Sequence, residues 1–100
     1  MVQGTTPTFI LTLPNTVDLT AINNLYFSLE QGTTTLMKTG DDLTIDGQTI
    51  SVYLSQSETL QFNPGRANLQ LNWTYNGGSR ACSNIASVTI GANLLKEVVS

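Results

Sequence analysis

The chain has 100 residues, of which 40% are hydrophobic and 11% are charged, and its formal net charge is −3 at pH 7. This length suits a single domain, residues 1–100, with a modest core, and the low charge argues against intrinsic disorder. The four basic residues are scattered along the chain. That argues against a nucleic-acid partner, because such a function needs clustered positive charge.

The single cysteine, Cys82, leaves no second thiol for an intrachain disulfide. Small secreted domains often depend on disulfides, so we expect the chain to fold in a reducing compartment. The N-terminus lacks the basic and apolar segments of a signal peptide, and no stretch approaches the ~20 apolar residues that span a bilayer. We therefore expect a cytoplasmic protein without a membrane partner.

The first forty residues predict three strands. Residues 8–13 alternate apolar and polar side chains between Pro7 and Pro14, and prolines at both ends favour the edge of a sheet. Residues 22–31 form the next strand, and the threonine-rich residues 33–39 read as a second edge strand. The expected inward-facing residues are Phe9, Leu11, Leu13, Leu25, Phe27, Leu29 and one of Leu36 and Met37.

Residues 42–54 predict a β-hairpin. Asp46 and Gly47 stand between two alternating segments, and an Asp-Gly pair readily supplies the positive φ angles of a tight turn. The aliphatic residues expected to fill the core from this hairpin are Ile45, Ile50, Val52 and Leu54. We expect this hairpin to set the register of the sheet.

The chain changes character after the hairpin. Residues 55–58 read Ser-Gln-Ser-Glu and match a capping box. In that motif Ser55 accepts from the N–H of residue 58, while the carboxylate of Glu58 accepts from the N–H of residue 55. One helical turn near residues 55–60 is therefore expected, and the Asn-Pro-Gly sequence at residues 63–65 ends it.

Two long strands, residues 66–75 and 80–90, are predicted next, joined by a loop at residues 76–79. Their inward face is expected to carry Leu69, Leu71, Trp73, Cys82, Ala86, Val88 and Ile90. Cys82 is thus predicted to be a buried small apolar group. Residues 91–100 have apolar side chains at helical spacing, yet a further strand or a docking tail fits them equally.

These segments amount to about seven strands at ~10-residue spacing with turn signals between most of them, which is typical of an immunoglobulin-like β-sandwich. The predicted fold class is therefore all-β, with one short helical turn near residues 55–60. The chain has no cysteine pair around its tryptophan, so this prediction concerns architecture rather than membership of the disulfide-bonded immunoglobulin domains.

Catalytic chemistry has little support in the sequence. The chain has no histidine, which excludes Ser-His-Asp and Cys-His arrangements, and Cys82 has no evident activating base. Asp41, Asp42 and Asp46 stand near one end of the hairpin and could offer oxygen ligands to Ca²⁺, although turn formation explains all three. We predict no catalytic, cofactor-binding or metal-binding residue and no enzymatic activity.

Three tyrosines carry the alternative function. Tyr26 and Tyr53 point away from the aliphatic faces of their strands, and Tyr75 lies near a loop. Exposed aromatic rings can stack on sugars, which would make the chain a carbohydrate-binding module. Cross-strand pairing on a half-exposed sheet face explains them without a ligand, and we favour that interpretation.

Several short motifs carry a family resemblance. They are Gly4-Thr5-Thr6-Pro7-Thr8, Leu13-Pro14, Thr44-Ile45-Asp46-Gly47, the segment 54–60 and Ser83-Asn84-Ile85. Together they resemble small uncharacterised proteins encoded in the tail and baseplate gene modules of prophages in Gram-positive gut bacteria. More distantly, the layout resembles the immunoglobulin-like N-terminal domain of the upper baseplate proteins of lactococcal-type siphophages.

The resemblance implies a virion structural or accessory component, made in the bacterial cytoplasm before assembly and lacking catalytic residues. With it, the sequence predicts a non-enzymatic structural or protein-interaction module. Its partners would be other subunits of a phage-like particle, including copies of itself. The expected contact surfaces are the edges at residues 33–39 and 8–13, where unpaired backbone groups can add a strand.

Overall fold

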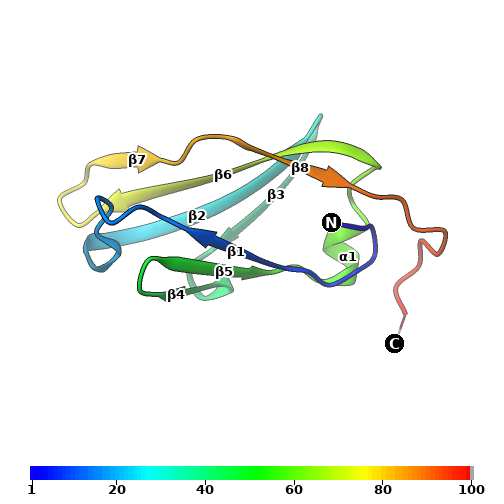
Figure 1. Cartoon of the computed structure of the whole chain (residues 1–100), viewed down its shortest axis with the longest axis horizontal. Helices are drawn as coiled ribbons and strands as arrows, with labels where there is room; N and C mark the ends of the chain where they lie inside the picture. The colour runs from blue at the N-terminus through cyan, green and yellow to red at the C-terminus, as the bar shows by residue number, and fades with distance from the viewer. Residues whose placement is uncertain (100) are drawn as a thin grey trace.

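The computed structural model describes residues 1–99 and has two β-sheets packed face to face, the all-β sandwich predicted from the sequence (Figure 1). The smaller sheet has the order β1 (Thr8–Thr12), β5 (Thr49–Tyr53), β4 (Leu43–Asp46). The larger sheet has the order β3 (Thr34–Thr39), β2 (Ile22–Gln31), β6 (Gly65–Tyr75), β7 (Arg80–Cys82), and β8 (Ala86–Ile90) also pairs with β6. The helical segments are η1 (Leu19–Ala21), η2 (Gly40–Asp42) and α1 (Gln56–Thr59).

Neighbouring strands in both sheets are antiparallel. The strand β1 lies at one edge of the smaller sheet and β3 at one edge of the larger sheet, so both predicted edge strands are confirmed. The one α-helix has four residues, and no helix within residues 1–99 is long and apolar enough to cross a membrane.

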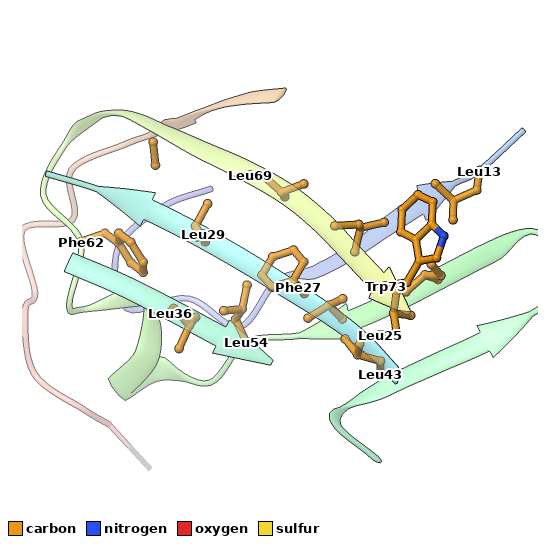
Figure 2. Packing of buried hydrophobic residues seen from close by; sticks show 14 of the residues in the cluster. Leu13, Leu25, Phe27, Leu29, Leu36, Leu43, Leu54, Phe62, Leu69 and Trp73 are labelled. Carbon is orange, nitrogen blue, oxygen red and sulfur yellow. The ribbon is translucent and has the colours of Figure 1, made fainter. Parts of the chain in front are cut away.

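The hydrophobic core lies between the two sheets (Figure 2). Phe27 and Leu29 of β2 and Ile50 and Val52 of β5 have 0% of their surface exposed. Side chains alternate along a strand, so each sheet sends every second residue into this layer. Phe9 of β1 reaches across to Phe27, with ring centroids 6.0 Å apart, a favourable separation for an aromatic pair. The prediction of the inward faces of β1 and β2 is confirmed.

The hairpin of β4 and β5 forms as predicted, with a different turn. Asp46 pairs with Thr49, which leaves Gly47 and Gln48 as the two central residues. Gly47 has φ +59°, and no residue other than glycine within residues 1–99 has a positive φ. A type I′ turn needs positive φ at both central residues, so this is the pattern with glycine first. Asp46 therefore precedes the turn rather than forming it.

The prediction that Ile45 fills the core is wrong, because 46% of its surface is exposed. Ile45 lies on β4, which is the outer strand of a three-stranded sheet. Its strand partner Ile50 lies on the central strand and is fully buried. An edge strand reaches beyond the facing sheet, so an aliphatic residue of the correct parity can still meet solvent there.

The helical turn α1 has the predicted capping box. The N–H of Glu58 donates to Ser55 Oγ at 3.3 Å, and the N–H of Ser55 donates to Glu58 Oε1 at 2.8 Å. The same carboxylate pairs with Lys38 of β3, with 2.6 Å between Nζ and Oε2. The single turn follows β5 and precedes β6, so it carries the chain from the smaller sheet to the larger one.

The predicted return strand at residues 80–90 is divided in two. Trp73 pairs with Ala81 and Leu69 pairs with Ala86, so four steps along β6 correspond to five along the return. The extra residue is a β-bulge, which reverses which side chains face inward. Cys82 is consequently exposed, and the prediction that it is buried is wrong. The division raises the number of strands within residues 1–99 to eight.

Ser83 holds the bulge in place. Its N–H donates to the carbonyl of Leu71 at 2.9 Å, and its Oγ accepts from the N–H of Leu71 at 2.9 Å. The side chain of Gln70 donates to the Ser83 carbonyl at 2.9 Å. A serine side chain thus takes the place of one backbone group in the ladder, which satisfies β6 where β7 and β8 are interrupted.

The two ends of the chain come together beyond β8, next to α1 (Figure 1). The N–H of Gly91 donates to the carbonyl of Met1 at 2.7 Å. Beyond Gly91 the described residues form neither a helix nor a strand. The amide of Gln56 exchanges two hydrogen bonds with the backbone of Val99, of 2.6 and 2.8 Å. Ser100, which the prediction for residues 91–100 also included, lies outside the described residues.

Candidate functional site

A cleft of about 450 Å³ opens between the loop end of β1 and the return strands β7 and β8. We call it the side cleft. Its lining includes Leu11, Leu13 and Val17 on one side and Leu71, Trp73 and Ala86 on the other. Leu11 and Val17 are only half-buried, so part of their apolar surface faces this opening. The cleft therefore brings solvent to the border of the hydrophobic core.

One polar group of the side cleft has no partner. The indole Nε1–H of Trp73 is buried and makes no hydrogen bond within residues 1–99. The ring lies beside Leu13 in Figure 2. A buried donor without an acceptor costs roughly 1–3 kcal/mol. Trp73 lines the side cleft, but its Nε1–H is buried away from solvent, so the surface that the cleft offers is mainly apolar.

Free backbone groups flank the cleft on both sides. The strand β1 pairs with β5 alone, and β7 and β8 pair with β6 alone. The outer N–H and C=O groups of these strands are therefore unpaired within the sheets. Such edges are the places where a strand from another chain can add to a sheet.

A second concavity, of about 410 Å³, lies on the outer face of the larger sheet. We call it the outer-face hollow. Its lining includes Tyr26, Ser28, Met37, Asn72, Thr74 and Arg80. These residues come from the four strands β2, β3, β6 and β7, and they alternate with the buried residues of the core. The hollow is thus built on the sheet rather than on a loop.

Strand pairing places the polar residues of the hollow side by side. Tyr26 pairs with Asn72 across β2 and β6, and Thr74 pairs with Arg80 across β6 and β7. Arg80 Nη2 donates to Asn72 Oδ1 at 3.2 Å, which joins the two pairs. A guanidinium has five N–H donors, so most of those of Arg80 remain available to a ligand.

The three tyrosines do not form one platform. Tyr53 is 54% exposed on β5, in the smaller sheet, whereas Tyr75 packs partly against the core at the end of β6. Only Tyr26 lines a hollow together with polar side chains. Of the three tyrosines considered for sugar recognition, Tyr26 therefore remains a candidate, and it lies apart from the other two.

The aspartates near the hairpin are also dispersed. Asp41 and Asp42 belong to η2 and Asp46 ends β4. Within residues 1–99 no group of three or more acidic, cysteine or histidine residues is arranged to hold a metal ion.

Two acidic residues elsewhere have structural partners. The hydroxyl of Thr20 donates to Asp18 at 2.6 Å and lowers the pKa of that carboxyl, aided by the N–H of Thr20. Burial raises the pKa of Glu58, but the hydrogen bonds from Lys38 and Ser55 outweigh it, so the pKa is lowered overall. Asp18 caps η1, while Glu58 caps α1 and pairs with Lys38 of β3. Neither carboxyl lines the side cleft or the hollow.

Arg80, Asn72 and Met37 were not singled out by the sequence as site residues. Their only signal is parity: each falls on the solvent face of its strand, as Tyr26 does. Their proximity depends on which strands are neighbours and in what register, and neither is written in a single strand.

Comparisons of the chain with known protein families, with curated proteins and with solved structures find no match. The inference of function therefore rests on the side cleft and the outer-face hollow.

Proposed function

We propose that the protein is a non-enzymatic structural or protein-interaction module that binds other subunits at the side cleft. The single observation that carries this proposal is an opening of about 450 Å³, bordered by core side chains, between two edges with unpaired backbone groups. Apolar surface in that position favours a protein partner, because a strand laid there gains main-chain hydrogen bonds and covers apolar side chains together.

The sheet edge at β3 was also predicted as a docking surface, and it stays a secondary candidate. Its residues Met37 and Thr39 are exposed beside a free edge.

The class of particle is part of the proposal. The sequence resemblance to prophage tail and baseplate modules suggests partners that are virion subunits. The more distant resemblance suggests a structural role like that of the immunoglobulin-like domain of upper baseplate proteins. One feature of the chain suits a non-enzymatic component: it has no histidine. Neighbouring tail genes in the source genome would support this class.

A matched pair of substitutions tests the cleft. Ala86→Arg places a long charged side chain in the cleft lining without removing a core contact, since Ala86 is exposed. Ser87→Arg makes the same addition one residue further, on the opposite face of β8. We expect Ala86→Arg to abolish retention by proteins of the neighbouring genes in pull-downs. The Ser87→Arg variant should be retained as well as the unchanged protein.

The proposal fails if the unchanged protein is monomeric by light scattering and none of those neighbours retains it. It also fails if both arginine variants bind equally well, because the partner would then lie elsewhere on the surface.

A second candidate function is recognition of a sugar. The observation that favours it is the outer-face hollow, where Tyr26 stands among hydroxyl and amide side chains on a sheet face. An aromatic ring with a few convergent polar groups is the usual composition of a small-ligand site.

A further inference from the structure

We propose that the outer-face hollow binds the carboxylate of an acidic saccharide, with Arg80 as the group that recognises the charge. This inference rests on the second candidate function and is independent of the side cleft.

The hollow has a single charged side chain. Arg80 lines it, and no aspartate or glutamate does among the described residues. The salt bridge found within residues 1–99 joins Lys38 to Glu58, neither of which lines the hollow, so the guanidinium has no carboxylate partner there. The chain as a whole carries a net charge of −3, which makes an isolated cation in a concave surface distinctive. A ligand with a carboxylate complements it by charge-assisted hydrogen bonds.

The orientation of Arg80 is set by the protein. Its Nη2 donates to Asn72 Oδ1 at 3.2 Å, and Thr74 lies opposite it in the strand register. One donor therefore ties the guanidinium to β6 while other donors stay available. A planar guanidinium held in this way suits a bidentate carboxylate, whose two oxygens match its fork.

The remaining lining suits the body of a sugar. Tyr26 and Met37 supply apolar surface against which the C–H groups of a pyranose ring can rest. Ser28, Asn72 and Thr74 supply neutral donors and acceptors for hydroxyl groups. A volume of about 410 Å³ lies near the lower end of the range for small-ligand sites.

Binding is tested by two-dimensional ¹⁵N NMR titration of the whole protein with matched probes. The acidic probes are methyl β-D-glucuronide and methyl α-D-galacturonide. The neutral probes are methyl β-D-glucoside and methyl α-D-galactoside, and sodium acetate tests the bare anion. We expect an acidic sugar to shift the amide signals of Asn72, Thr74 and Arg80. It should bind about tenfold more tightly than its neutral counterpart, the gain from one charge-assisted contact.

Arg80→Gln removes the charge, and the exposed position of the side chain leaves the fold intact. Arg66→Gln is the matched control: Arg66 lies on the same outer face of β6, six residues from Asn72 and so about 20 Å along the strand. We expect Arg80→Gln to lower the affinity for acidic sugars to that for neutral ones. Arg66→Gln should leave both affinities unchanged.

Three outcomes overturn the inference in distinguishable ways. Equal binding of acidic and neutral sugars removes the role of the carboxylate and leaves sugar recognition standing. Equal binding of acetate and the acidic sugars shows a site for an anion only. If none of the four sugars shifts the amide signals of the residues that line the hollow, the second candidate function fails together with the inference. The proposal for the side cleft is unaffected by that result.

Discussion

Replacing Gly47 by valine should destabilise the protein through the backbone alone. Gly47 has φ +59° at the first central position of the β4–β5 turn. A Cβ built there meets no atom within 4 Å, so a steric clash with neighbours contributes nothing. Left-handed backbone costs an ordinary residue roughly 1–2 kcal/mol, and a strained position costs up to about 3. Valine is stiff at χ1, so we expect about 2 kcal/mol.

The same substitution at Gly77 is the control. Gly77 lies in the loop between β6 and β7, its φ is not positive, and a Cβ there also meets nothing within 4 Å. For a domain of this size, 1 kcal/mol corresponds to about 4–8 °C in Tm. Thermal unfolding followed by circular dichroism should therefore show that Gly47→Val lowers Tm by roughly 8–16 °C. The Tm of Gly77→Val should stay close to that of the unchanged protein. Equal Tm values for the two variants would refute the assignment of the turn.

Three further predictions concern the core, the helix cap and the thiol. Phe27→Ala should cost about 3–5 kcal/mol in urea unfolding, because the ring is fully buried, and a loss no larger than that of the 67% exposed Ile10→Ala would contradict this packing. The lowered pKa of Glu58 implies that its stabilising contacts are present above its ordinary value of 4.5 and are lost as pH falls through the lower folded value. Glu58→Gln should accordingly unfold more readily than the unchanged protein near pH 7, with the gap closing in acid; a constant gap would disprove it. Cys82 should react with iodoacetamide in the native protein without prior unfolding, and protection until unfolding would argue against the bulge.

The features predicted correctly are those that a few neighbouring residues control. The capping box around Ser55 and Glu58 needs only four consecutive residues, and both of its hydrogen bonds form. The strand at Ile22–Gln31 has the predicted bounds, because apolar and polar residues alternate regularly from Leu25 to Glu30. Short-range chemistry of this kind leaves little for the rest of the chain to decide.

The features predicted wrongly depend on distant residues. The exposure of Ile45 follows from the position of β4 at a sheet edge, which the sequence of the hairpin does not contain. Cys82 was assigned to the inward face by counting alternate residues, and the bulge at Ser83 shifts that count by one. A bulge is held by hydrogen bonds to another strand, so a pattern within one strand cannot reveal it.

The residues of the candidate site also differ in whether the sequence could indicate them. Tyr26 could be selected from the sequence as an aromatic residue on a solvent face. Asn72 and Arg80 could not, since they join it only when β2, β6 and β7 become neighbours in their observed register. The side cleft was equally hidden, because it is the gap between edges of two different sheets.

The sequence by itself determined that this protein is built of strands, where most of them lie, which face of the regular strands is apolar, and where the chain turns. Each of these properties follows from side-chain period and local backbone preference, which act over a few residues. The tertiary structure alone decided that β4 lies at an edge, where the ladder is interrupted, and which polar residues meet on the outer face. Those depend on pairing between segments far apart in the chain, as between Tyr26 and Asn72, and pairing is settled only when the whole core is buried together.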